Sequence, residues 1–194
     1  MNLVDRVKKL IVSPTQEWQV IKDEPHTVAG LYTHYVMILV AIPAVASFIG
    51  LSLIGYSGMG STYRMPIAAG VANMVLYYVL MLGGVYLMAL VIDMQAPSFG
   101  GEKNFIQALK VAAFFPTAAW LSGIFFILPA LAILALVGAV YSLWILYTGL
   151  GPLMGVADER SAGYVAVVVV VAILVMVVIS TIAALAMPSP SRGF

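Results

Sequence analysis

Long apolar stretches alternate with short polar interruptions along this chain, and five of the stretches are long enough to cross a lipid bilayer. A helix that crosses a hydrocarbon core of about 30 Å needs about 20 apolar residues. The pattern predicts spans near residues 33–55, 66–92, 105–128, 129–150 and 163–187. The fifth is the clearest, because residues 165–179 include no polar side chain.

The third and fourth predicted spans follow each other almost without a loop, at Leu128-Pro129-Ala130. Together they hold about 45 mainly apolar residues, which is too many for a single crossing. The joint could connect a pair of kinked segments or form a tight hairpin between two crossings. We favour the hairpin.

Two short amphipathic helices are predicted before the first span. Leu3, Val7, Leu10 and Ile11 repeat at helical spacing, while Asp5, Arg6, Lys8 and Lys9 are assigned to the other face. This pattern is typical of a helix that lies in the headgroup plane of a membrane. Ser13 and Pro14 predict the start of a second helix, with Ser13 as its N-cap, and Pro25 ends it. Lys8, Lys9 and Lys22 are the candidate contacts to anionic lipid headgroups.

Composition supports a membrane protein. The 194 residues are 63% hydrophobic and 9% charged, with a mean hydropathy of +1.07, whereas soluble domains have about 25% charged residues. We therefore expect an all-α integral membrane protein, a five-helix transmembrane bundle with short amphipathic N-terminal helices. Residues 1–32 would form cytoplasmic interfacial helices, 33–187 the transmembrane domain and 188–194 a disordered tail. The charged N-terminus does not resemble a cleavable signal peptide.

Orientation follows from the Lys and Arg residues near the span ends, because these gather on the cytoplasmic side. With the N-terminus inside, the inner side would hold Arg6, Lys8, Lys9, Lys22, Lys103, Lys110 and Arg160, and the outer side Arg64 and Arg192. The sequence therefore predicts a cytoplasmic N-terminus and an external C-terminus. Asp158, Glu159 and Arg160 would form a cytoplasmic loop.

A polar interruption at residues 93–104, DMQAPSFGGEKN, is the main candidate for function. Its candidate residues, with one from the following span, are Asp93, Pro97, Gly100, Gly101, Glu102, Lys103, Asn104 and Lys110. The Gly-Gly-Glu-Lys segment lacks the spacing and the hydroxyl of a phosphate-binding loop. We interpret the interruption as a structured contact surface on the inner face. Asp93 and Lys110 could form an ion pair. We favour the alternative, in which the Lys110 side chain extends to the headgroups and Asp93 ends its helix in water.

The residue types that support catalysis or metal binding are sparse. The chain has no cysteine, so thiolate chemistry and disulfides are excluded. His26 and His34 match no compact ligand motif, and Asp158 and Glu159 are adjacent residues that rarely converge on one ion. We expect no cofactor, no metal site and no enzymatic activity. A net charge of +1 gives no field that would attract nucleic acid.

Several segments resemble the Yip family, the Ypt/Rab-GTPase-interacting multi-spanning membrane proteins, in its bacterial branch. They are VSPTQEW at 12–18, EP at 24–25, Tyr35 with IP at 42–43, IDMQAPSFGGEKNFIQALK at 92–110 and FPTAAWL at 115–121. The resemblance covers residues 3–184 and implies a five-span α-helical bundle with a cytoplasmic N-terminus. Eukaryotic relatives assist vesicle traffic by binding prenylated Rab-type GTPases. This chain lacks their long acidic, proline-rich N-terminal region, so Rab-type GTPase binding is not carried over.

The resulting hypothesis is a non-enzymatic protein of a bacterial or archaeal plasma membrane. It would organise the membrane or act as a scaffold at the inner face, with lipids, a second copy of itself or other membrane proteins as partners. The alternative is a transporter or channel for a small or lipid-like substrate, built on helices broken at Pro43 and Pro116. A polar cavity that reaches Asn73 and Asp93 would favour transport, and a dry, closely packed bundle would favour scaffolding.

Overall fold

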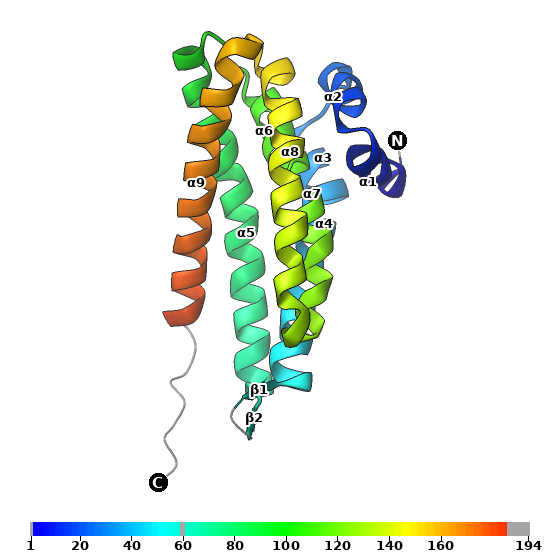
Figure 1. Ribbon diagram of the computed structural model, residues 1–194, viewed down its shortest axis with the longest axis vertical. Coiled ribbons are helices and arrows are strands. Elements are labelled where there is room, and N and C mark those ends of the chain that lie inside the picture. Colours follow the sequence, from blue (N-terminus) through cyan, green and yellow to red (C-terminus); the bar gives the residue numbers. More distant parts are fainter. Residues whose placement is uncertain (1, 59–60, 186–194) are drawn as a thin grey trace.

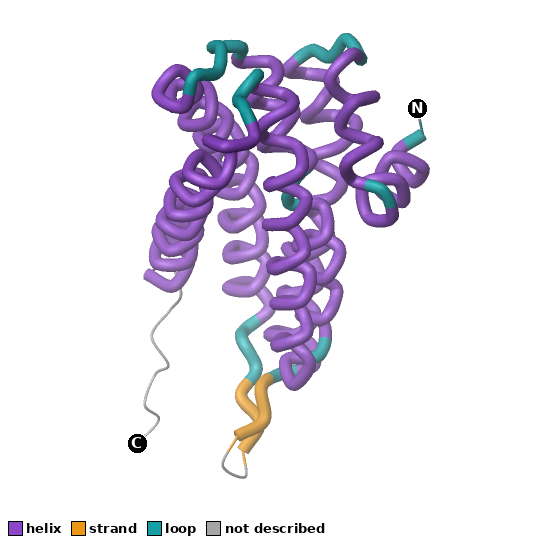
Figure 2. The backbone as a smooth tube through the Cα atoms, turned by 45° about the horizontal axis from the view of Figure 1, so that its top comes forward, coloured by secondary structure: helices purple, strands orange, loops and turns teal. Residues whose placement is uncertain are grey.

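The computed structural model describes residues 2–58 and 61–185, and its five long helical segments stand side by side in one bundle (Figure 1). The five spans and the all-α class are thus confirmed. A short hairpin, β1 (Tyr56–Gly58) and β2 (Ser61–Tyr63), joins the first two spans at one end of the bundle (Figure 2). The tail at 188–194, predicted to be disordered, lies outside the described residues.

Each span is made of consecutive helical pieces. The first comprises α3 (Val28–Leu31), the π-helical η1 (Tyr32–Val36), α4 (Met37–Phe48) and the π-helical η2 (Ile49–Ile54). The second comprises α5 (Ile67–Gln95) and the 3₁₀-helical η3 (Ala96–Phe99). The third comprises α6 (Phe105–Phe114), α7 (Thr117–Ser122) and η4 (Gly123–Ile127), and the fourth η5 (Pro129–Leu134) and α8 (Ala135–Met154). The fifth is α9 (Asp158–Leu185).

Three of these boundaries differ from the sequence prediction by five residues or more. The first span begins at Val28 rather than near residue 33. The second span continues past residue 92, so residues 93–99 are helical rather than loop. The fifth span begins at Asp158, so Asp158, Glu159 and Arg160 form its first turn rather than a loop. Acidic residues stabilise the positive N-terminal end of a helix dipole, which explains why a charged segment can begin a membrane helix. The tight hairpin is confirmed, because Leu128 has an extended conformation and Pro129 opens the next helix.

The break between α6 and α7 at Pro116 leaves backbone groups without their usual helical partners, and nearby hydroxyls bond to them. The Thr117 hydroxyl donates to the Phe114 carbonyl at 2.5 Å, and the Tyr35 hydroxyl lies 2.7 Å from Thr117 Oγ1. Across the bundle, Ser142 Oγ accepts from the backbone N–H of Ala119 at 2.9 Å. Irregular backbone at membrane depth is tolerated when it is satisfied inside the protein in this way.

The first two helices, α1 (Leu3–Val12) and α2 (Pro14–Asp23), form a pair that packs on the flank of the bundle (Figure 1). The Trp18 side chain of α2 is fully buried, and its indole N–H donates to the Ile145 carbonyl of α8 at 2.9 Å. Gly149 makes room for the ring, because a Cβ at this position would overlap the indole. The Tyr141 hydroxyl of α8 donates to the Ile11 carbonyl at 2.5 Å.

Replacing Gly149 by alanine should therefore loosen the helix pair. We expect Gly149→Ala to lower the free energy of unfolding by about 1–3 kcal/mol, as overpacking of a filled site does. Gly83→Ala is the matched control, because no atom lies within 4 Å of the added Cβ. Alanine should be neutral there or stabilise the helix by up to about 1 kcal/mol. Thermal unfolding of both variants in one detergent measures the difference, and equal stability would contradict the packing role of Gly149.

Candidate functional surface at the charged end of the bundle

The candidate segment at 93–104 is a folded connection between the second and third spans. Helical structure continues through Phe99, and Gly100 then reverses the chain with a positive φ of 78°. This conformation is strained for residues that have a Cβ. A Cβ at Gly100 would also lie 2.8 Å from Nη1 of Arg160, which shows that the guanidinium of α9 covers this turn.

Backbone and ring contacts fix this connection to the turn between α8 and α9. The Glu102 N–H donates to the Met154 carbonyl at 3.0 Å, and a Cβ on Gly101 would collide with the same oxygen. The Phe99 ring stacks on the Tyr164 ring with centroids 4.9 Å apart, and the Tyr164 hydroxyl donates to the Ile92 carbonyl. Residues 96–104 and 155–160 thus form one continuous area, which we term the polar-end surface.

The predicted loop residues between 97 and 104 contribute to this surface, whereas Asp93 does not. Pro97, Gly100, Glu102 and Lys103 are exposed, and Gly101 is half-buried against the neighbouring turn. Asn104 is exposed but has a structural role, since its Oδ1 accepts from the Gln107 N–H at 3.1 Å and caps α6. Asp93 lies within α5, near Tyr164, with one carboxylate oxygen buried and without a hydrogen-bond donor among the described residues.

Neither alternative for Asp93 and Lys110 is correct. Lys110 is 2% exposed, so it does not snorkel to the headgroups, and it forms no ion pair with Asp93 among the described contacts. Its ammonium donates to the Lys22 carbonyl at 3.0 Å, together with the Gln107 amide at 3.0 Å. A cation at the C-terminal end of a helix satisfies unpaired carbonyls and interacts favourably with the dipole. Lys110 therefore attaches α2 to α6.

Sequence reasoning missed an ion cluster inside the N-terminal helix pair. Arg6, which we assigned to the polar face of its helix, is 5% exposed. Its guanidinium donates to Glu17 at 2.5 Å and to Glu24, and Glu24 also lies 3.2 Å from His26 Nε2. The helical spacing contained the signal. Arg6 lies between Leu3 and Leu10 at spacings of three and four, so it belongs to the buried face.

An aromatic contact connects this cluster to the bundle. The Phe114 ring of α6 lies 4.5 Å from the Tyr35 ring, 6.3 Å from Trp18 and 6.0 Å from His26, measured between centroids. The Arg6 guanidinium lies over the same ring at 5.7 Å. A cation over an aromatic face is stabilised by the ring quadrupole, so Phe114 supports the buried charge as well as the packing.

The three predicted lipid contacts, Lys8, Lys9 and Lys22, are all exposed. Lys8 and Lys9 border a groove between α1 and α2, whereas Lys22 lies at the end of α2 that Lys110 caps. Ser13 lies at the start of α2 as predicted, but its side chain makes no capping hydrogen bond. Within residues 2–58 and 61–185, no group of three or more His, Asp or Glu side chains has a metal-binding arrangement.

The pKa of His26 is lowered below its ordinary value of 6.5, mainly by partial burial and secondly by the positive charge of Lys110. Glu24 acts in the opposite direction and raises it. The docked helix pair thus binds fewer protons at His26 than the undocked pair does. Docking should weaken as the pH falls below 6.5.

We expect the hydrogen exchange of α2 amides to become faster as the pH is lowered from 7.5 to 5.5, relative to the intrinsic exchange rate at each pH. His26→Gln should flatten this dependence, and His34→Gln, at an exposed position, should leave it unchanged. If the pH dependence of exchange persists in His26→Gln, it arises from the carboxylates and not from His26.

The comparisons agree with this architecture. Residues 8–179 match the Yip1 domain family. The chain is 32% identical to the inner membrane protein YohC of Escherichia coli strain K12 over 159 residues, covering 80% of this chain and 82% of the relative. The protein of the same name from Escherichia coli O6:H1 strain CFT073 matches equally, and no solved structure matches. The chain is therefore a multi-pass integral membrane protein that belongs to the Yip1 domain family.

Proposed function

We propose that this protein is a non-enzymatic membrane organiser that presents the polar-end surface to another membrane protein or to a second copy of itself. The observation that supports the proposal most directly is the attachment of residues 96–104 to the turn after α8. The Glu102 N–H bond to Met154 and the Arg160 guanidinium over Gly100 hold the two segments in one fixed arrangement. A preorganised surface loses little conformational entropy when a partner binds.

The charge pattern of this surface suits a protein partner. Glu102 and Lys103 from one segment are exposed, as are Asp158, Glu159 and Arg160 from the other. Both signs thus occur side by side. Mixed charges at an interface select partners through complementary pairs and reject those with like charges.

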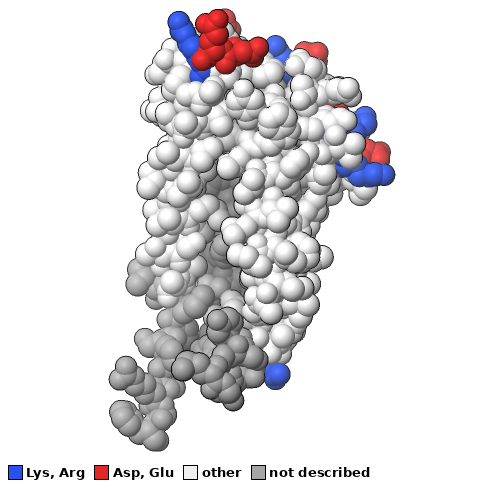
Figure 3. Space-filling view, viewed as in Figure 1, with Lys and Arg blue, Asp and Glu red and all other residues white. Residues whose placement is uncertain are grey.

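We propose further that this end faces the cytoplasm of a bacterial or archaeal plasma membrane, so that the N-terminus is inside and the C-terminus outside. Figure 3 shows the charged side chains gathered at one end of the molecule and on the adjoining flank, above a broad uncharged band. The described Lys and Arg residues lie at that end and flank, except Arg64 beyond the first span. Basic residues concentrate on the cytoplasmic side of a membrane protein.

A transporter is the second candidate, and one observation favours a transporter for lipid-like substrates. A groove of about 760 Å³ lies among α5, α8, α9 and the broken third span, and both Pro43 and Pro116 are among its lining residues. Met81, Val85, Leu143 and Ile173 are among its mainly apolar lining residues, which include neither Asn73 nor Asp93. A polar solute would find few partners there, so the groove suits a lipid-like substrate rather than an ion or a small polar molecule.

The orientation can be tested by cysteine labelling, since the natural chain has no cysteine that would react in the background. Ser98→Cys lies on the polar-end surface, and Ser57→Cys lies in the hairpin at the other end. In intact cells, a membrane-impermeant maleimide should label Ser57→Cys. It should reach Ser98→Cys only after permeabilisation, and the reverse pattern would contradict the proposed orientation.

The scaffold role can be tested by photocrosslinking from the polar-end surface in native membranes. A photoreactive residue at Lys103 or Glu159 should give a reproducible protein adduct, which mass spectrometry would identify as a second copy or another membrane protein. Val137, 70% exposed on α8, is the control for random contacts with neighbours in the membrane. Gly100→Val should reduce the adduct, because it forces a branched side chain into the left-handed conformation beside Arg160.

Two results would contradict scaffolding. Equal adducts from Val137 and Lys103 would show that the polar-end surface has no preferred partner. A lipid adduct from a photoreactive residue at Ile173, combined with no protein adduct from Lys103, would select the transporter.

A further inference from the structure

The apolar groove along the side of the bundle is a feature that the polar-end surface does not explain. Figure 1 shows α5 between α8 and α9. Met81, Val85 and Met88 of α5 are buried lining residues, whereas Val140 of α8 and Ile173 of α9 are exposed lining residues. Helix α5 thus forms the floor of this hollow, and α8 and α9 form its walls. We term it the lateral groove.

The lining of the lateral groove suits hydrocarbon. None of its residues is charged, and most are aliphatic or aromatic. The hydroxyl-bearing residues are Tyr77, Ser142, Ser180 and Thr181. Ser142 and Thr181 already bond to backbone groups of the protein. An apolar hollow of this kind binds apolar ligands in preference to water.

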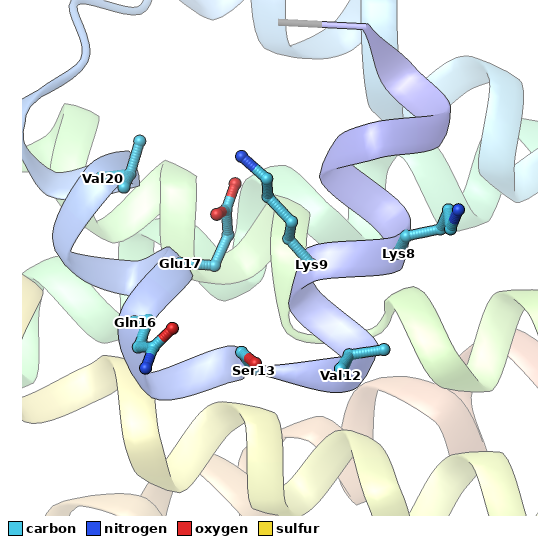
Figure 4. Close-up of a pocket in the computed structure, with 7 residues that line it drawn as sticks. All are labelled: Lys8, Lys9, Val12, Ser13, Gln16, Glu17 and Val20. Carbon is cyan, nitrogen blue, oxygen red and sulfur yellow. The ribbon is translucent and has the colours of Figure 1, made fainter.

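The groove between α1 and α2 has the opposite chemistry. It measures about 400 Å³, and its lining includes two lysines and a glutamate. Figure 4 shows Lys9 of α1 and Glu17 of α2 facing the same space, with Lys8 projecting from α1. A hydrocarbon chain placed there would displace water from charged groups, which is costly. A lipid chain should therefore select the lateral groove.

The dimensions of the lateral groove match one hydrocarbon chain. Its lining on α9 lies within residues 169–181, which extend over about 18 Å. The chains of one leaflet occupy half of the core, about 15 Å. The volume of about 760 Å³ lies within the range of about 300–1,000 Å³ that is typical of sites for one ligand. A helix about 10 Å wide and about 18 Å long would need about 1,400 Å³, so a helix of a second copy could cover the groove but not enter it.

Helix α9 has few specific attachments along this groove. Among residues 158–185, Tyr164 provides the one described side-chain hydrogen bond to another helix, near the start of α9. Farther along, Val175 and Ile179 pack on α5 at Gly84. In a bilayer, helices are held together largely by van der Waals packing, and an unfilled gap forfeits that attraction. An occupant that contacts both walls would therefore strengthen the attachment of α9 to α8.

We propose that the lateral groove binds one acyl chain of a membrane phospholipid, which bridges α8 and α9 as a structural ligand. The chain contacts Val140 and Leu143 on one wall and Ile173 and Val177 on the other. The headgroup remains at the bilayer surface, so the site selects the chain and not the headgroup. The site is separate from the polar-end surface, and a failure of the crosslinking experiment there leaves it standing.

Native mass spectrometry of the full-length protein, after extraction in detergent and mild delipidation, tests the site. The natural protein should keep one phospholipid. Ala139→Phe with Ala172→Phe places two rings in the groove, because both alanines line it. This double variant should retain about tenfold less lipid, since the rings take the place of chain contacts with the walls.

A matched control adds the same rings outside the groove. Val137 on α8 and Val178 on α9 are 70% and 56% exposed and do not belong to the lining. Val137→Phe with Val178→Phe should retain the phospholipid as the natural protein does. Equal retention by the two double variants would overturn the site and indicate lipid bound all around the bundle.

Thermal unfolding separates a filled groove from a lost fold. A ligand that binds the folded state raises the unfolding temperature, so adding phosphatidylglycerol should stabilise the delipidated natural protein. The Ala139→Phe, Ala172→Phe variant should unfold no lower than the delipidated natural protein and should respond little to lipid. If the rings lower its unfolding temperature, Ala139→Leu with Ala172→Leu fills the groove with smaller groups and is judged by the same measurements. A full response to lipid in a filled variant that folds would overturn the site.

A choice of lipids distinguishes the chain from the headgroup. Phosphatidylglycerol and phosphatidylcholine with identical palmitoyl chains should bind within about twofold of each other, because the lining provides no charge to attract an anion. Phosphatidylcholine with hexanoyl chains should bind about tenfold more weakly, because fewer of its CH₂ groups contact the walls. A strong headgroup preference, or equal binding of both chain lengths, would overturn the assignment to an acyl chain. A lipid-free dimer that the phenylalanine variant loses would assign the groove to a second copy instead.

Discussion

The position of the N-terminal helix pair depends on one buried guanidinium. Arg6 is 5% exposed and lies between the carboxylates of Glu17 and Glu24. Removing one partner of a buried ion pair costs about 3–5 kcal/mol, because the remaining charge stays uncompensated. The need to keep Arg6 paired with these carboxylates fixes α2 against α1. It thereby sets the position from which Trp18 enters the space beside Gly149. The same constraint presents the Lys22 carbonyl to the Lys110 ammonium.

The bundle could be predicted from sequence because hydrocarbon thickness imposes one simple requirement on every span, and the apolar runs meet it. The residues that join elements could not be predicted in the same way. Lys110 was expected at a membrane surface or beside Asp93, since linear spacing shows which end of a helix a residue occupies but not which neighbour packs there. Its partner is a backbone carbonyl at Lys22, and such a group is invisible in a search for opposite charges.

Other differences come from helix boundaries and faces. Asp158 was expected in a loop because it is charged, yet acidic residues are favoured in the first turn of a helix. The Arg6 charge suggested a solvent-facing position, although its spacing from Leu3 and Leu10 places it on the buried face. In both cases the polarity of the side chain was weighed more heavily than its geometric position. The sequence shows the polar segment at 93–104 but not that residues 93–99 are helical, and its attachment to Met154 depends on a fold that brings distant turns together.

The helix breaks bear on how the molecule works. In transporters, interrupted helices commonly expose backbone groups to a substrate or an ion. Here the groups beside Pro116 are already bonded, with Thr117 on the Phe114 carbonyl and Ser142 on the Ala119 N–H. Helix α6 begins at Phe105, directly after its cap Asn104 in the polar-end surface, and extends to Phe114 beneath the N-terminal pair. A partner bound at the polar-end surface would therefore be held at a fixed position relative to the N-terminal helix pair by helix α6, which is what a scaffold requires.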